Sequence, residues 1–186
     1  MLKKTSYLLA VGGLILAAGC ATVSGFSPFR FTPGAADLPK DAVDRLAQEM
    51  EAKVAAGDRE MALTAPEGLV LGDGVLQAAR TRAIRSELVK NLLRSGFAVE
   101  QRNGTIALIR NRDYRKATSS RERDRNALVV MSENADRWTI YEGLVRDSGL
   151  KGGSLSGIQE AFYRARIPLL EPGMKYQDDS GSMVVR

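Results

Sequence analysis

The sequence predicts an α+β fold: about four helices, a β-hairpin near residues 97–109 and a short C-terminal strand pair, in a single small domain. Three observations lead to this prediction. Apolar residues recur at helical spacing in four segments. Asn103-Gly104 separates two apolar-rich runs, which is the strongest short-range hairpin signal. The C-terminal tail carries two short runs around an Asp/Ser/Gly turn, which is typical of a strand pair.

The four helices are expected over residues 41–56, 75–95, 120–148 and 156–166. Asp41 is a good N-cap for the first, and Ser156 with Gln159 forms a capping box for the last. Gly57 and Gly96 fit positions just beyond helix ends. The apolar faces expected for the four helices are, in order, Val43, Leu46, Met50 and Val54; Leu76, Ala79, Ala83, Leu88 and Leu92; Leu128, Met131, Ala135, Trp138 and Val145; and Ile158, Ala161, Phe162 and Ala165. Tyr141 and Leu144 widen the third of these faces.

Between the helices, residues 61–74 are rich in glycine and predict a loop. A two-residue turn at Asn103-Gly104 would pair Arg102 with Thr105 and Val99 with Leu108.

Charged residues are expected mainly on solvated faces. Arg82, Arg85 and Lys90 lie opposite the apolar face of their helix, so they are predicted to face solvent. The segment 110–125 holds seven basic and three acidic residues. It would suit anionic headgroups or an acidic partner. Because acids interleave with the bases, a solvated loop leading into a helix is the favoured interpretation.

The N-terminus has the pattern of a secretory signal peptide over residues 1–19. Lys3 and Lys4 precede an apolar stretch, residues 7–18, that is too short for a comfortable membrane span of roughly 20 residues. The stretch closes with Leu16-Ala17-Ala18-Gly19-Cys20, which resembles the lipobox of bacterial lipoproteins, with the leucine one place further from the cysteine than usual. We therefore expect Cys20 to be lipidated and to anchor the chain in a membrane.

The rest of the chain then divides into two parts. Residues 20–40 contain three prolines and lack periodicity, so they predict a lipid-anchored tether, and residues 41–186 form the α+β domain. Ala21, rather than aspartate, follows the cysteine and resembles the outer-membrane address of Gram-negative lipoproteins. The expected location is the periplasmic face of the outer membrane.

The composition excludes several kinds of chemistry. The chain has no histidine, and Cys20 is its only cysteine. With that cysteine acylated, Ser-His-Asp and Cys-His catalysis and the usual zinc sites are excluded. The mature chain would carry a mild excess of three basic residues. We expect no metal, cofactor or nucleic acid.

Several short runs carry a resemblance to a known family. They are Gly96–Glu100 followed by Gly104, Ser132–Trp138 followed by Ile140-Tyr141, Pro172-Gly173 and Tyr176-Gln177. Over about residues 80–186 the chain resembles the YdbL-like family of periplasmic proteins, described by a conserved domain of unknown function. The family has no established enzymatic activity and occurs with AsmA-like proteins that bridge the two membranes. The resemblance implies a non-enzymatic accessory or chaperone-like role in an envelope assembly for intermembrane lipid transport, with an AsmA-like protein as a partner.

The run Glu133–Trp138 has a physical interest of its own. On helical spacing Asn134, Trp138 and Tyr141 lie on one face, near Arg137. Because Trp, Tyr and Arg dominate interface energetics, these four residues are candidates for binding a partner. In the competing interpretation they hold the domain together, with Trp138 in the core and Asn134 or Asp136 bonded to the hairpin or the Gly-rich turn.

Two other functions stay open. A lipid-binding module would need an apolar cavity large enough for an acyl chain. A cell-wall enzyme would need paired carboxylates such as Glu133 and Asp136, but these lie three residues apart on one helix, whereas glycosidase carboxylates face each other across a cleft.

Overall fold

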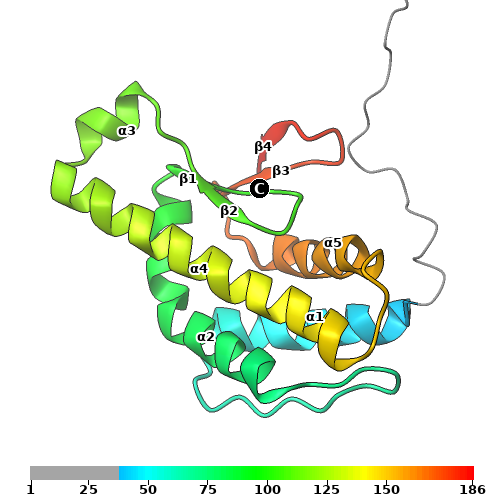
Figure 1. Ribbon diagram of the computed structural model, residues 1–186. Coiled ribbons are helices and arrows are strands. Elements are labelled where there is room, and N and C mark those ends of the chain that lie inside the picture. The colour runs from blue at the N-terminus through cyan, green and yellow to red at the C-terminus, as the bar shows by residue number, and fades with distance from the viewer. Residues whose placement is uncertain (1–37) are drawn as a thin grey trace, which may run out of the picture. The chain divides into compact units, whose positions relative to one another are not determined.

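The computed structural model describes residues 38–186. The predicted signal peptide, Cys20 and most of the predicted tether lie outside these residues. In chain order the elements are α1 (Lys40–Ala56), α2 (Asp73–Arg94), β1 (Ala98–Glu100), β2 (Ile106–Leu108), α3 (Arg112–Ala117), α4 (Ser120–Asp147), α5 (Ser154–Arg166), the 3₁₀ turn η2 (Ile167–Leu169), β3 (Lys175–Gln177) and β4 (Met183–Val185) (Figure 1). The α+β fold class, the central hairpin and the C-terminal strand pair are confirmed.

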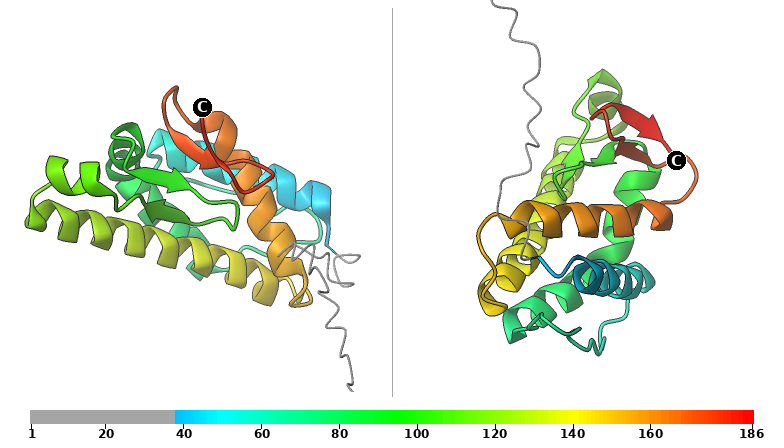
Figure 2. Two further views of the ribbon diagram at one scale, coloured as in Figure 1. Left: turned by 90° about the horizontal axis from the view of Figure 1, so that it is seen from above. Right: turned by 90° about the vertical axis from the view of Figure 1, so that its right-hand side faces the viewer.

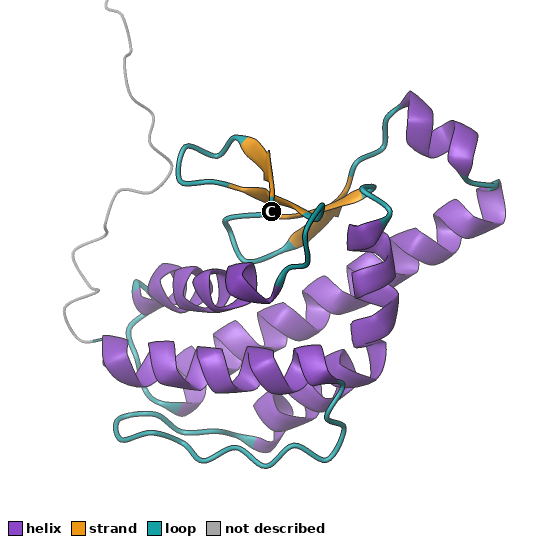
Figure 3. Cartoon of the chain, turned by 180° about the vertical axis from the view of Figure 1, so that it is seen from behind, coloured by secondary structure: helices purple, strands orange, loops and turns teal. Residues whose placement is uncertain are grey.

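The four strands form one small mixed sheet in the order β2-β1-β3-β4. The two outer pairs are antiparallel, and β1 pairs with β3 in parallel, with Val99 opposite Lys175. The C-terminal strand pair therefore extends the hairpin sheet, which lies to one side of the helices (Figure 3).

The hairpin register differs by one residue from the prediction. Ala98 pairs with Leu108 and Val99 with Ala107, because the turn is a three-residue loop over 102–104 rather than a two-residue turn. The Gln101 N–H donates to the Thr105 carbonyl at 2.8 Å, and Gly104 takes the left-handed conformation with φ 85°. A three-residue loop that ends in a left-handed glycine is the next most common hairpin connection.

The helices pack around one large apolar core. α2 lies along α4, and α1 lies against both α2 and α5 (Figure 2). The expected apolar faces of α1 and α5 are buried in this core. A smaller apolar cluster lies between the sheet, α2 and α4 and contains Val89, Leu92, Leu93, Ala98, Ile106, Val130 and Met174.

Two helices face the core differently from the prediction. On α4, Leu128 and Met131 are 63% and 67% exposed and Ala135 is exposed, while Trp138 and Val145 are only partly buried. On α2, Leu88 is 52% exposed and Arg82 is buried. The predicted α4 stripe is therefore wrong at Leu128, Met131 and Ala135 but holds in its second half, where Tyr141 and Leu144 are buried and Trp138 and Val145 pack against the core. The predicted solvated face of α2 is wrong at Arg82. The buried residues of α4 are Val130, Glu133, Arg137, Ile140, Tyr141, Gly143 and Leu144.

Some helices begin and end at the residues predicted from the sequence, and others do not. Gly57 and Gly96 have φ 72° after α1 and near the end of α2, as predicted. α1 begins at Lys40 after Pro39, so Asp41 lies in the first turn and is not the cap. α5 begins at Ser154, so the predicted Ser156 cap is wrong. The short helix α3 was not predicted.

The loop before α2 has no regular secondary structure, as expected, but part of it contributes side chains to the core. Met61 and Leu69 from this loop are buried in the large core. Within residues 38–186, none of the helices is apolar over enough of its length to cross a bilayer.

Candidate functional site: a buried ring of charges

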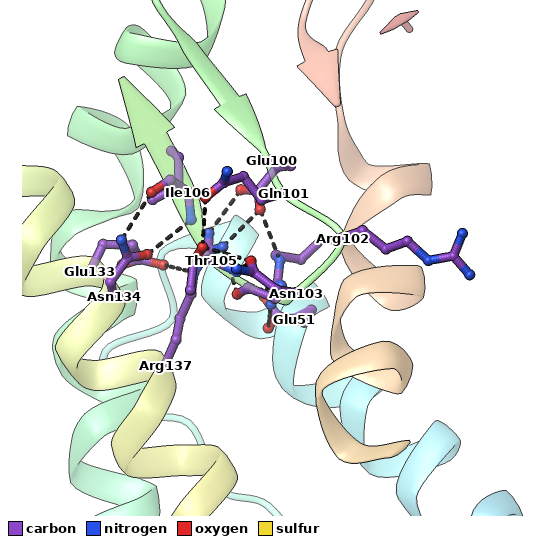
Figure 4. A network of polar contacts seen from close by, with 12 residues as sticks. Glu51, Glu100, Gln101, Arg102, Asn103, Thr105, Ile106, Glu133, Asn134 and Arg137 are labelled. Carbon is purple, nitrogen blue, oxygen red and sulfur yellow. Dashed lines mark hydrogen bonds and ion pairs between the residues drawn. The ribbon is translucent and has the colours of Figure 1, made fainter. Parts of the chain in front are cut away.

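Six charged side chains meet in the middle of the domain, and all are buried. They come from five elements: α1, α2, β1, α4 and α5. The side chains are Glu51, Arg82, Glu100, Glu133, Arg137 and Arg166. Three carboxylates and three guanidiniums alternate, so the cluster carries no net charge. Figure 4 shows the part of this cluster nearest the hairpin.

The ion pairs close into a ring. Arg82 donates two hydrogen bonds to Glu51, at 2.9 and 2.8 Å, and its Nε donates to Glu133 at 2.9 Å. Arg137 Nε donates to the same Glu133 oxygen at 2.8 Å.

The remaining ion pairs connect Arg137 through Glu100 and Arg166 to Glu51 on α1. The two terminal nitrogens of Arg137 donate to Glu100 at 2.7 and 2.8 Å. Arg166 donates to Glu100 at 3.3 Å and to Glu51 at 2.8 Å. Each acid therefore has at least two basic partners and each base has two acidic partners, so every buried charge is compensated. We name this cluster the charge ring.

The charge ring keeps the carboxylates of Glu51 and Glu133 ionised. Burial by itself raises the pKa of Glu133, but the guanidiniums of Arg82 and Arg137 outweigh it and hold that pKa far below its ordinary value. Against the same opposing effect of burial, Arg82 and Arg166 lower the pKa of Glu51. Carboxyls that stay ionised this strongly make poor general acids, and as bases they would have to give up arginine partners.

The hairpin loop is fastened to the charge ring through one carbonyl. The Gly104 oxygen accepts hydrogen bonds from Tyr141 Oη at 2.9 Å, Arg166 at 2.9 Å and Arg137 at 3.2 Å. Arg166 also donates to Tyr141 Oη at 3.1 Å. α4, α5 and the loop are thus joined at one point.

The sequence-predicted site residues occupy different environments. Asn134 forms two hydrogen bonds with the backbone of Ile106, accepting from its N–H and donating to its carbonyl, both at 2.9 Å (Figure 4). Arg137 and Tyr141 are buried in and beside the charge ring. Trp138 is partly buried, and its ring lies 6.2 Å from that of Tyr141.

These contacts favour the interpretation in which the Glu133–Trp138 run holds the domain together. The polar groups of Asn134, Arg137 and Tyr141 are used inside the fold, with Asn134 bonded to the hairpin. Of the four candidates, Asn134 and Trp138 keep part of their surface exposed. Partner binding by these residues stays a prediction.

Sequence reasoning missed Glu51, Glu100 and Arg166 as members of a shared cluster. The available signal was the helical spacing of charges on apolar faces. Glu51 follows Ala47 by four residues, and Arg166 follows Phe162 by four, so each charge falls on a buried stripe. Equal numbers of opposite charges on such stripes indicate a buried ion network.

Two pockets lie near this cluster. A pocket of about 70 Å³ has the charge ring on one side and apolar side chains on the other, among them Val89, Leu93 and Met174. A second pocket, of about 450 Å³, lies between α1 and α5, where Asp44 pairs with Arg164 at 3.1 Å.

The arrangement therefore provides a rigid neutral centre and no free pair of carboxylates. Asp136, the second carboxylate considered for an enzyme, pairs with Arg85 at 2.7 Å, and Arg85 also pairs with Glu133 at 3.1 Å. In the part of the chain that the structure describes, the acidic residues form no group suited to a metal ion.

Comparison with known proteins gives no relative: no protein-family model, curated protein or solved structure matches the chain.

Proposed function

We propose that the chain is a lipid-anchored envelope protein of YdbL-like type, held at the periplasmic face of the outer membrane and acting as a non-enzymatic accessory factor for an envelope assembly. The observation that carries the proposal is the N-terminus: a basic start, a short apolar stretch and a lone cysteine at its end. A single residue that bears several acyl chains anchors a protein stably.

The site geometry supports a binding role over a catalytic one. Glu133 and Asp136 both form ion pairs with arginines, and the first belongs to the charge ring. An enzyme would have to break these pairs before either carboxylate could act on a substrate. A folded platform that presents surfaces to a partner requires no such rearrangement.

The anchor is tested by metabolic labelling with tritiated palmitate in a Gram-negative host. The wild type is expected to incorporate label and to sediment with outer membranes, whereas Cys20→Ser loses the label and no longer sediments with outer membranes. Ser24→Ala, four residues after Cys20 in the proposed mature chain, serves as the matched control and keeps the label. Equal labelling of the wild type and Cys20→Ser would contradict the proposal.

The accessory role is tested by crosslinking in intact envelopes, followed by pulldown of the lipidated protein. A specific envelope protein is expected with the wild type, and its recovery falls in Trp138→Ala if the exposed part of Trp138 contributes to the contact. Trp138→Phe keeps an aromatic ring against Tyr141 and controls for core packing. Val70→Ala removes an exposed side chain elsewhere and is the surface control. Recovery of no specific partner from any folded variant would contradict the accessory role.

A further inference from the structure

The segment 110–125, which contains α3 and the start of α4, is rich in positive charge and is followed on α4 by exposed apolar side chains. We name this segment the basic tip. Six of its cations are exposed: Arg110, Arg112, Arg115, Lys116, Arg121 and Arg125. Within residues 38–186 none of these six takes part in an ion pair, in contrast to the arginines of the charge ring.

The three acids of the basic tip, Asp113, Glu122 and Asp124, offset only part of this charge. Glu122 is engaged at the start of α4, where it accepts hydrogen bonds from the backbone N–H and the hydroxyl of Ser119, both at 2.7 Å. Asp113 lies in the first turn of α3, where a negative charge complements the helix dipole. Seven bases against three acids leave the segment strongly positive.

The apolar side chains continue the same surface of α4. Arg121, Arg125, Leu128 and Met131 follow one another at steps of four, three and three residues, which places them along one face of the helix. Leu128 and Met131 are the two most exposed large apolar side chains among the described residues, at 63% and 67%. Binding to a membrane interface combines electrostatic attraction of cations to anionic lipids with burial of apolar side chains at the boundary of the acyl region, and this surface offers both kinds of group.

The position of the basic tip leaves it open to a large partner. In Figure 1, α3 and the start of α4 project at the end of α4 opposite its junction with α5. Tyr114 holds α3 to the domain: it is buried, its ring lies 5.2 Å from that of Phe97, and its hydroxyl accepts a hydrogen bond from Asn126 at 3.2 Å. The cations are therefore carried on a fixed scaffold.

We propose that the basic tip binds the surface of an anionic phospholipid bilayer, with the cations at the headgroups and Leu128 and Met131 at the edge of the acyl region. The six exposed cations are distributed over the loop before α3, α3 itself and the first turns of α4, which suits a broad anionic surface better than a single acidic motif. The adjacent apolar pair suits a partner that has an apolar layer directly beneath its charges. This binding goes beyond the proposed function, because it does not require the acyl anchor.

The experiment measures binding of the proposed mature chain, residues 20–186 with Cys20→Ser, to vesicles of phosphatidylethanolamine with phosphatidylglycerol, and to vesicles of phosphatidylcholine alone. The test variant adds Arg115→Gln, Lys116→Gln, Arg121→Gln and Arg125→Gln. The matched control removes four exposed cations elsewhere, through Arg45→Gln, Arg59→Gln, Arg146→Gln and Arg186→Gln. Thermal unfolding confirms that all chains are folded.

The expected result is strong binding of the parent chain to the anionic vesicles only. Each cation near such a surface contributes about five-fold to the partition coefficient, so the test variant loses roughly several hundred-fold. The control is expected to keep most of its binding. A Leu128→Gln, Met131→Gln variant loses a smaller, salt-insensitive part, while about 1 M salt, which shortens the Debye length to about 3 Å, abolishes the electrostatic part.

Several outcomes would overturn the proposal. They are equal losses in the test and control variants, equal binding of the parent chain to neutral vesicles, and no loss in the Leu128→Gln, Met131→Gln variant. Binding of the parent chain to polyglutamate but not to anionic vesicles would assign the basic tip to an acidic protein instead. Because the anchor is absent from every sample, these results do not depend on lipidation of Cys20.

Discussion

At the scale of single residues, the charge ring is the costliest feature of the domain to disturb. Each of its members has partners in other elements, and all are buried. Removing one partner of a buried ion pair leaves an uncompensated charge, which is far more costly than losing a surface pair. One substitution within the charge ring and one in the hairpin loop bonded to it test how much these contacts contribute to stability.

Arg137→Met is expected to lower the free energy of unfolding by about 3–5 kcal/mol, because Glu100 loses its two-bond partner and Glu133 loses one of its three arginines. Denaturation by urea measures the change. Arg146→Met, at an exposed arginine of the same helix, controls for charge and propensity and should change stability by no more than about 0.5 kcal/mol. A similar small effect for Arg137→Met would show that the ring contributes little.

Gly104→Ala is expected to destabilise the domain more than Gly149→Ala. Both glycines have positive φ, 85° and 62°, so each alanine suffers left-handed strain of about 1–2 kcal/mol. Only at Gly104 would the new Cβ also come within 3.1 Å of the Tyr141 ring and hydroxyl, whereas it meets nothing within 4 Å at Gly149. Chemical denaturation of the two variants compares the costs, and equal costs would contradict the contact argument.

The individual members of the charge ring could be predicted from the sequence only in part. Glu133 and Arg137 have the spacing of a helical pair, and that pair forms at 2.8 Å. Glu100 and Arg166 lie 66 residues apart, and their meeting depends on how the hairpin and α5 pack, which no local pattern encodes.

At the scale of elements, the positions of the long helices could be predicted from the sequence, but the faces of α2 and α4 that are buried could be predicted only in part. The 28-residue α4 has apolar residues on two faces, one with Leu128 and Met131 and one with Ile140 and Leu144. Apolar spacing predicted a stripe through Leu128 and Met131 that Leu144 widens, and it did not single out Ile140. The charge ring fixes the buried face, because Glu133 pairs with Arg82 on α2 and Arg137 pairs with Glu100 on β1.

The starts of α4 and α5 allow a matched test of helix capping. Ser119 accepts a hydrogen bond from the Glu122 N–H and Glu122 accepts one from the Ser119 N–H, so Ser119→Ala is expected to cost about 1 kcal/mol. Ser156, which the sequence suggested as a cap, lies within α5 and donates to the Gly153 carbonyl at 3.3 Å. Ser156→Ala should therefore be nearly neutral. Thermal unfolding distinguishes the two, and the reverse order of effects would contradict the assigned helix starts.

At the scale of the whole molecule, the domain is built so that its charged centre ties distant segments together. The fold class followed from patterns of about ten residues, such as the Asn-Gly hairpin and the Asp/Ser/Gly turn of the tail. The parallel pairing of β1 with β3 joins residues about 76 apart and depends on the path of α4 and α5 between them. The charge ring sits where these segments meet, so its ionisation is expected to govern the stability of the entire domain.

The stability of the domain is expected to fall in acid and to be flat near neutral pH. Unfolded glutamates titrate near 4.5, whereas the folded pKa values of Glu51 and Glu133 lie lower, so the unfolded chain binds more protons in this range. The stability contributed by the two carboxylates is therefore fully present above about pH 4.5 and is lost as the pH falls toward the folded pKa values. With no histidine in the chain, no imidazole adds a step between pH 5 and 8.

Glu133→Gln tests this dependence. It is expected to reduce stability at pH 7, because Arg82 and Arg137 lose a shared charge, and also to flatten the decline between pH 5 and 3, because one titrating carboxylate is gone. Urea denaturation at several pH values measures both effects. Glu142→Gln, at an exposed glutamate of the same helix, is the control and should leave the slope unchanged. If the acid slopes of the wild type and Glu133→Gln coincided, the charge ring would not be the source of acid sensitivity.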